Sequence, residues 1–281
     1  MDHPEVVSDL PVKELVLRAR GPRVVMRFRH LPGGTFVMGS RGYHKEEEPP
    51  HSVRISPFWM AETPVTQREF ALWTQSRHYK SWQKENSDLV RDPHENSFKN
   101  QDNNPADNVT WFEADAYCHW IQSRCADKLS GLSISLPSKA QWEYACRAGT
   151  HSEYHTGDGE AALMEAGWFR NNSNSQTQEV KQKRPNFFGL YDMHGNVWEW
   201  CRDEWDADSY RRTGDNATDP VVDSSPRSNQ PRVLRGGSWS DDARNCRSSS
   251  RGWFNPDFRG RFDGNWDIGF RVCLVPGPLS S

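Results

Sequence analysis

The chain has 281 residues and a formal net charge of −3, so it has no overall basic field of the kind that draws proteins to nucleic acid. No apolar run approaches the roughly 18 residues of a membrane-spanning helix, and residues 1–17 carry acidic side chains where a signal peptide has an apolar core. We therefore expect a cytoplasmic protein that binds neither nucleic acid nor membrane. The 13 Trp, 13 Phe and 7 Tyr can each bury a large area, which predicts an aromatic core.

Strand patterns open the chain. Residues 24–30 alternate apolar and basic side chains, residues 35–38 are mostly apolar, and the turn residues Pro32–Gly34 between them predict a hairpin. The strand pattern resumes over residues 53–59. Pro57 interrupts it, because proline cannot donate a hydrogen bond to a neighbouring strand.

Three helix starts follow, each marked by a capping box. In this motif a hydroxyl accepts a hydrogen bond from a backbone N–H, and a Glu or Gln three residues later reaches back to the cap. Apolar residues at helical spacing follow each box. The boxes pair Thr66 with Glu69, Thr110 with Glu113, and Ser138 with Gln141.

The second half of the chain is less regular. Residues 151–230 are rich in Gly, Asn, Asp and Ser, which predicts long loops with islands of order around Trp168 and residues 189–205. Strand-like segments at residues 232–235 and 268–274 close the chain. No solenoid-length repeat and no Pro-, Gly- or Ser-rich linker divides the sequence, so we expect one domain.

Six cysteines are scattered without any CxxC pair or zinc-like spacing, which favours buried structural thiols. They are Cys118, Cys125, Cys146, Cys201, Cys246 and Cys273.

Seven sequence blocks in order resemble the formylglycine-generating-enzyme-like (sulfatase-modifying factor) superfamily, over residues 31–274. The blocks are Gly33–Ser40 (GGTFVMGS), Glu62–Thr66 (ETPVT), Asn108–Trp111 (NVTW), Leu136–Ala145 (LPSKAQWEYA), Gly189–Trp200 (GLYDMHGNVWEW), Arg235–Trp239 (RGGSW) and Ile268–Arg271 (IGFR). The resemblance implies an α+β fold of the C-type-lectin-like kind, with little regular secondary structure and long loops. It also implies calcium sites in the loops and a ligand face in the last third of the chain.

The expected organisation follows from this coverage. Residues 1–30 form an N-terminal extension that includes the first strand, and residues 31–275 form the formylglycine-generating-enzyme-like domain. Residues 276–281 are a tail. Within the domain, residues 239–267 are expected to be a variable ligand-binding region.

The catalytic members of the superfamily use metals whose ligands are missing here. The copper oxidase needs two reactive cysteines just after the Gly-Gly-Ser-aromatic block, because soft thiolates hold Cu(I), but residues 240–245 contain no cysteine. The iron triad of the sulfoxide synthases reads His-x-x-x-His-x-Glu. The nearest string, His151 to Gly157, ends in glycine where the carboxylate is needed. Neither copper nor iron is therefore expected.

The resemblance also assigns the cysteines. It places Cys146 and Cys246 as neighbours at a structural pair of the family. It matches Cys118 as well, but the expected partner is displaced by one residue to Cys273, and a one-residue shift in a strand turns the side chain to the opposite face.

Residues 239–267 have the composition of a recognition surface. Aromatic side chains alternate with Arg and Asp, and the segment contains no Val, Leu, Ile or Met. The alternative is a loop whose aromatic rings fold inward. The residues expected in one solvent-facing ligand site are Trp239, Ser240, Asp241, Asp242, Arg244, Ser248, Ser250, Trp253, Phe254, Phe258, Arg259, Phe262 and Trp266.

The same segment, framed by residues 232–239 and 268–271, resembles the variable region of proteins diversified by retroelements. This favours a non-catalytic protein that binds a protein or another macromolecule. The alternative is a divergent formylglycine-generating-type oxidase or an enzyme-accessory module. The sequence indicates neither the ligand nor the oligomeric state.

The resemblance further implies a calcium site at the turn around Gly195. Asn196 and Glu199 would offer side-chain oxygens and Val197 its carbonyl oxygen, which are ligands that this hard cation prefers. The alternative is that Glu199 only accepts hydrogen bonds from nearby groups.

Overall fold

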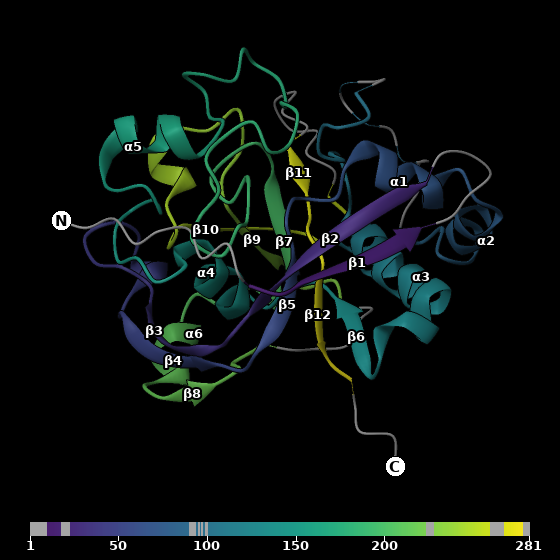
Figure 1. Ribbon diagram of the computed structural model, residues 1–281. Helices are drawn as coiled ribbons and strands as arrows, with labels where there is room; N and C mark the ends of the chain where they lie inside the picture. The colour runs from purple at the N-terminus through teal and green to yellow at the C-terminus, as the bar shows by residue number, and fades with distance from the viewer. Residues whose placement is uncertain are drawn as a thin grey trace.

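The structure is a computed structural model that combines three β-sheets with α-helices in an α+β fold (Figure 1). Figure 1 shows helices α1, α2 and α3 gathered on one side of the sheets, and α4, α5 and α6 on the other. The residues it describes are 10–17, 23–89, 94, 96, 98, 101–222, 228–258 and 267–277.

The largest sheet has five strands in the order β1-β2-β5-β12-β6, and every neighbouring pair is antiparallel. The expected alternation is clear in β2, where Val24, Met26 and Phe28 are buried and Arg27 is exposed. The strands are β1 (Val12–Leu17), β2 (Val24–Leu31), β5 (Phe58–Ala61), β6 (Leu132–Ser135) and β12 (Cys273–Pro276).

The predicted hairpin across Pro32–Gly34 is wrong. Strand β2 pairs with β1 and β5, whereas β3 (Gly34–Met38) pairs with β4 (His51–Ile55) in a three-stranded sheet that β8 (Ala217–Thr218) completes. Gly33 has a φ of +74°, and a Cβ atom there would lie 2.5 Å from the Ile55 carbonyl oxygen. The turn therefore passes the chain from one sheet to another. The predicted break at Pro57 is confirmed, because it separates β4 from β5.

The third sheet carries the region of interest, in the order β10-β9-β7-β11. Strand β10 pairs only with β9, so its other edge is open within the described chain. The predicted strand at residues 268–274 is split into β11 and β12, which lie in different sheets. The strands are β7 (Trp198–Glu204), β9 (Arg232–Arg235), β10 (Arg251–Phe254) and β11 (Ile268–Gly269).

All three predicted capping boxes are confirmed at the starts of α1, α3 and α4. In each, the hydroxyl accepts from the third helical N–H, and the Glu or Gln accepts from the backbone N–H of the cap. The helices are α1 (Gln67–Thr74), α2 (Arg77–Glu85), α3 (Trp111–Leu129), α4 (Lys139–Arg147), α5 (Gly159–Ala166) and α6 (Ser209–Thr213), with the 3₁₀ turns η1 (Lys45–Glu47) and η2 (Ala243–Cys246).

The core is aromatic, as the composition predicts: Trp73, Trp142 and Trp200 are almost completely buried. Ion pairs are buried as well. Arg247 donates to both carboxylate oxygens of Glu47, at 2.7 and 2.9 Å, and ties the segment after η2 to the loop around η1. Loss of one partner from such a pair leaves an uncompensated charge in the interior.

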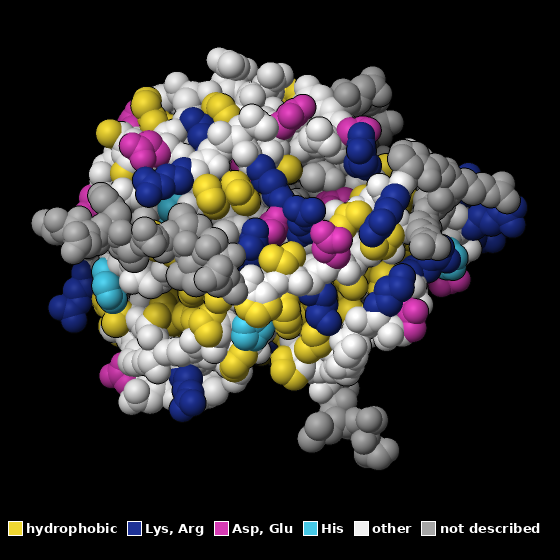
Figure 2. Space-filling view, viewed as in Figure 1, with side chains coloured by type: hydrophobic (Ala, Val, Ile, Leu, Met, Phe, Trp, Pro, Cys, Tyr) yellow, Lys and Arg dark blue, Asp and Glu magenta, His cyan; other side chains and the backbone are white. Residues whose placement is uncertain are grey.

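The face in Figure 2 mixes side-chain types: apolar groups gather over β3, β4 and β5, and basic groups are interspersed with acidic ones elsewhere. Within the described part of the chain, no helix has the length and apolar character needed to cross a bilayer.

Candidate ligand site

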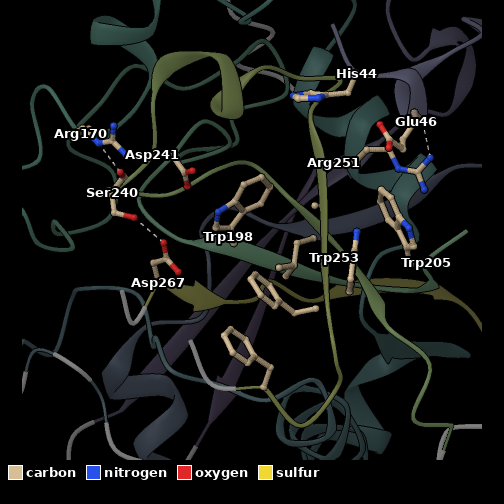
Figure 3. Close-up of a pocket in the computed structure, with 14 residues that line it drawn as sticks. His44, Glu46, Arg170, Trp198, Trp205, Ser240, Asp241, Arg251, Trp253 and Asp267 are labelled. Carbon is tan, nitrogen blue, oxygen red and sulfur yellow. Dashed lines mark hydrogen bonds between the residues drawn. The ribbon is translucent and has the colours of Figure 1, made fainter. Parts of the chain in front are cut away.

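A cavity of about 480 Å³ lies against the sheet β10-β9-β7-β11 (Figure 3). Its size falls in the range of small-molecule sites and of pockets for a single side chain. The residues lining it are His44, Glu46, Arg170, Trp198, Trp205, Leu234, Ser240, Asp241, Arg251, Gly252, Trp253, Phe254, Phe258 and Asp267.

Strand β10 supplies the aromatic wall. Trp253 and Phe254 are 48% and 41% exposed, although apolar side chains of this size are usually buried. Because they are consecutive in a strand, their side chains leave opposite faces of β10, and both line the cavity. Phe254 stacks on Phe258 with ring centres 4.2 Å apart, and Trp253 lies 6.1 Å from Trp205.

One end of the cavity is acidic. Asp241 and Asp267 both contact the Ser238 hydroxyl, whose Oγ lies 2.7 Å from Asp241 Oδ2 and 2.6 Å from Asp267 Oδ2. The Ser240 hydroxyl donates to Asp267 at 2.9 Å, and the Asn245 amide donates to Asp241 at 2.8 Å. The pKa of Asp267 is raised to about 6: burial and the nearby charge of Asp241 raise it, and the hydrogen bonds from the two serines oppose that rise.

Arg251 lies at the opposite end (Figure 3). Its guanidinium packs over the rings of Trp205 and Tyr210, with 4.2 and 4.6 Å to their centroids. It donates to the backbone carbonyls of Glu46 at 2.8 Å and Asp206 at 3.1 Å. Burial lowers the pKa of this Arg. The guanidinium is therefore held by protein groups on most of its surface.

The structure brings part of the predicted site together. Ser240, Asp241, Trp253, Phe254 and Phe258 all line the one cavity. Three further predicted residues, Arg259, Phe262 and Trp266, lie outside the described residues.

The other predicted residues lie elsewhere. Trp239 is buried and packs edge-to-face on Phe98, with ring centres 5.8 Å apart. Asp242 and Arg244 are exposed and do not line the cavity, and Asp242 pairs with Arg170 at 2.6 Å.

The expectation that Ser248 and Ser250 face solvent is incorrect. The Ser248 backbone N–H donates to the Glu153 carbonyl, and the Ser250 carbonyl accepts from Arg235. Both serines are buried because the adjacent Arg247 is pulled inward by its ion pair.

Several lining residues were missed from the sequence. Trp198 and Trp205 fall in the predicted island of order at residues 189–205, and Asp267 follows the aromatic segment, so composition offered a signal for these. His44 and Glu46 reach the cavity from a loop some two hundred residues away in the chain, and no local pattern indicates that approach.

The turn at Gly195 does not fit a calcium ion as it is arranged. Both Glu199 carboxylate oxygens accept from Arg271, at 2.6 and 2.7 Å, and one also accepts from the Trp142 indole at 2.7 Å. The Asn196 side-chain oxygen accepts from the Gln178 backbone N–H. A guanidinium thus occupies the place of the cation at Glu199.

Val197, whose carbonyl oxygen is the third expected ligand, is buried. Among the described residues, no group of three or more His, Cys, Asp and Glu side chains has the arrangement of a metal site. The calcium site that the resemblance implies is untested by this structure, although the contacts of Glu199 and Asn196 argue against it.

All six cysteines are buried free thiols. Cys146 and Cys246 contact the same histidine: Cys146 Sγ lies 3.6 Å from His194 Nε2, and His194 Nδ1 lies 2.8 Å from the Cys246 carbonyl oxygen. Burial raises the pKa of Cys146 to about 12 and that of Cys246 well above its usual value. Neither is therefore a thiolate at neutral pH. Cys118 and Cys273 are likewise free.

Comparison with known proteins agrees with this fold. Residues 19–275 match the family described as the sulfatase-modifying factor enzyme 1-like domain. The chain belongs to this family. This sulfatase-modifying-factor-like chain is 30% identical over 319 residues to the formylglycine-generating enzyme of Streptomyces coelicolor, which covers 94% of this chain and 93% of that enzyme.

It is also 30% identical over 241 residues to the serine/threonine-protein kinase pkn1 of Chlamydia caviae, although it spans only about a third (35%) of that kinase's length. Among solved structures, Treponema denticola variable protein 1 superposes with a TM-score of 0.73 at 26% identity, over 94% of this chain and 99% of that protein. PvdO from Pseudomonas aeruginosa superposes with a TM-score of 0.70 at 24% identity, over 88% of this chain and 94% of PvdO, and shows the shared fold.

Proposed function

We propose that this chain is a non-catalytic ligand-binding member of the family that takes a protein or another macromolecule into the cavity beside β10. The half-exposed Trp253 and Phe254 carry this proposal. Rigid aromatic side chains lose little rotamer entropy on binding and provide large contact areas. An apolar wall left open to water on an edge strand is otherwise a liability for aggregation.

Two further observations support a binding role. The likeness to Treponema denticola variable protein 1 extends over nearly the whole chain. No cysteine lines the cavity, and burial raises the pKa of all six thiols. We propose that residues 239–267 are a variable region diversified by a retroelement. A reverse transcriptase gene and a near-identical template repeat beside the gene would support the diversification.

Partner capture tests the binding role. The double variant Trp253→Ser, Phe254→Ser removes the wall, and a pull-down followed by mass spectrometry compares it with the wild type. The matched control is Val37→Ser, Met164→Ser, because these side chains are 46% and 45% exposed and do not line the cavity. Capture should be lost only in the first variant. Equal capture by both, or unfolding of the first variant alone, would contradict the proposal.

A divergent oxidase is the second candidate, and the 30% identity to the Streptomyces coelicolor enzyme favours it. It requires thiolates that hold copper, and the buried thiols offer none as arranged. Conversion of a cysteine-containing peptide to a formylglycine peptide, with added copper and oxygen, would establish it.

A further inference from the structure

At the acidic end of the cavity, one hydroxyl lies within hydrogen-bond distance of two carboxyl groups, and it can donate to only one of them. A hydroxyl carries one proton, yet the Ser238 hydroxyl is in short contact with carboxylate oxygens of both Asp241 and Asp267. The other short contact needs a proton on the carboxyl group, or else a positive charge nearby to offset two carboxylates held this close.

No basic side chain of the described chain supplies that charge. Neither carboxylate forms an ion pair with Lys, Arg or His there, and Arg170, which lines this part of the cavity, is bound to Asp242 and the Ser240 carbonyl. The other groups that donate to Asp241 are also neutral: the Ser238 backbone N–H at 3.0 Å and the Asn245 amide at 2.8 Å. Among the described residues, this end of the cavity therefore carries two carboxyl groups and no basic side chain paired with them.

The walls between the two ends suit a cation as well. Trp198 and Trp253 lie between the acidic end and the Arg251 end in Figure 3. The face of an indole ring attracts an ammonium or guanidinium group, and more strongly when water is excluded. The Arg251 end is a poor anion site by comparison, since Glu46 and Asp206 carbonyls already accept from its guanidinium.

We infer that the cavity selects a ligand group with a protonated amine or a guanidinium on an apolar stem, held between the aromatic wall and the Asp241–Asp267 pair. The inference rests on the proposed function and refines it. A Lys or Arg side chain of a partner protein and a free organic amine share this chemistry.

The affinity should depend on pH in a defined direction. With the pKa of Asp267 at about 6, its ionised fraction falls about tenfold between pH 7 and pH 5, while an alkyl ammonium stays protonated throughout. The charged and titratable groups that line the cavity with it are Asp241 beside it, Arg170 at the rim, and His44, Glu46 and Arg251 across the cavity. Cation binding should therefore weaken about tenfold on acidification.

The experiment uses the full chain and intrinsic tryptophan fluorescence, since three tryptophans line the cavity. The probes are 2-phenylethylamine and its neutral analogue 2-phenylethanol. Two blocked tripeptides, Gly-Lys-Gly and Gly-norleucine-Gly, distinguish a side chain from a free amine as the source. At pH 7.5 the amine and the lysine peptide should each bind at least tenfold more tightly than their neutral analogues, and the preference should shrink at pH 5.

The variant Asp267→Asn should lose about tenfold in amine affinity and keep its affinity for the alcohol. The control Asp102→Asn removes an exposed carboxylate that pairs with Arg68, and it should change the affinity for neither the amine nor the alcohol. Asp241→Asn serves as a second test if the first variant fails to fold. Equal binding of amine and alcohol, an unaffected Asp267→Asn, or binding of neither probe would overturn the charge selection. Partner capture through Trp253 and Phe254 is measured separately, so the binding role can survive that result.

Discussion

Glu199→Gln should be among the most destabilising conservative substitutions in this chain. Glu199 and Arg271 are both fully buried, and the carboxylate accepts two hydrogen bonds from the guanidinium and one from Trp142. The glutamine keeps the shape and can still accept through one oxygen, but it leaves the guanidinium without a counter-charge. Breaking a buried ion pair in this way costs about 3–5 kcal/mol. Because whole domains are stable by only about 5–15 kcal/mol, the melting temperature should fall by on the order of 10 °C.

Urea unfolding followed by fluorescence measures the loss of stability. The matched control is Glu14→Gln, which removes the same charge from the exposed pair with Arg27, and exposed pairs contribute only about 0–1 kcal/mol. Adding Arg271→Met to Glu199→Gln should recover part of the loss, because the uncompensated charge is then removed. If Glu199→Gln loses less than about 1 kcal/mol, the pair is not desolvated as argued, and the reasoning about this turn is wrong.

Three other outcomes follow from the structure. EGTA should leave the melting temperature unchanged, because protein donors already occupy the carboxylate of the proposed calcium turn, whereas a fall of several degrees would establish the ion. Maleimide should label Cys146 and Cys246 at pH 7.5 only after denaturation, since burial raises their pKa; rapid labelling of the native chain would show reactive thiols. Gly195→Ala should cost at least about 2 kcal/mol in urea unfolding, because φ is +83° and the new Cβ would lie 2.0 Å from the Trp168 carbonyl oxygen. Gly149→Ala, with φ of +90° and open space around it, should cost only about 1 kcal/mol, and equal losses would contradict the clash.

Features written in a few consecutive residues could be predicted from the sequence. The capping boxes at Thr66, Thr110 and Ser138 are local, since each needs only one hydroxyl and one Glu or Gln three residues on. The pairing of β3 was not predictable in this way. A turn at Gly33 reads the same whether the chain folds back on itself or crosses to another sheet, and distant strands decide between the two.

The same limit applies to the site. The exposure of Trp253 and Phe254 was predictable, because residues 239–267 contain aromatic, Arg and Asp residues but no Val, Leu, Ile or Met, unlike a core segment. The burial of Ser248 could not be predicted, because serine occurs both in the core and on the surface. Its position depends on the ion pair between its neighbour Arg247 and Glu47, which are about 200 residues apart in the sequence. Features that depend on neighbouring residues in the sequence could therefore be predicted. The path of the backbone after η2 could not, because an ion pair between residues far apart in the sequence determines it.

The ion pair between Arg247 and Glu47 has a consequence for how this surface can evolve. The segment between β9 and β11 therefore has two parts. The first is the anchor, Arg247, whose ion pair holds the backbone in place after η2; the second is the edge strand β10, which pairs with β9 through backbone hydrogen bonds. Side chains at Trp253 and Phe254 can therefore be exchanged with little effect on that ladder, while Arg247 cannot. Inherited change in ligand preference is free to accumulate at the strand edge, and the anchor is where purifying selection should act.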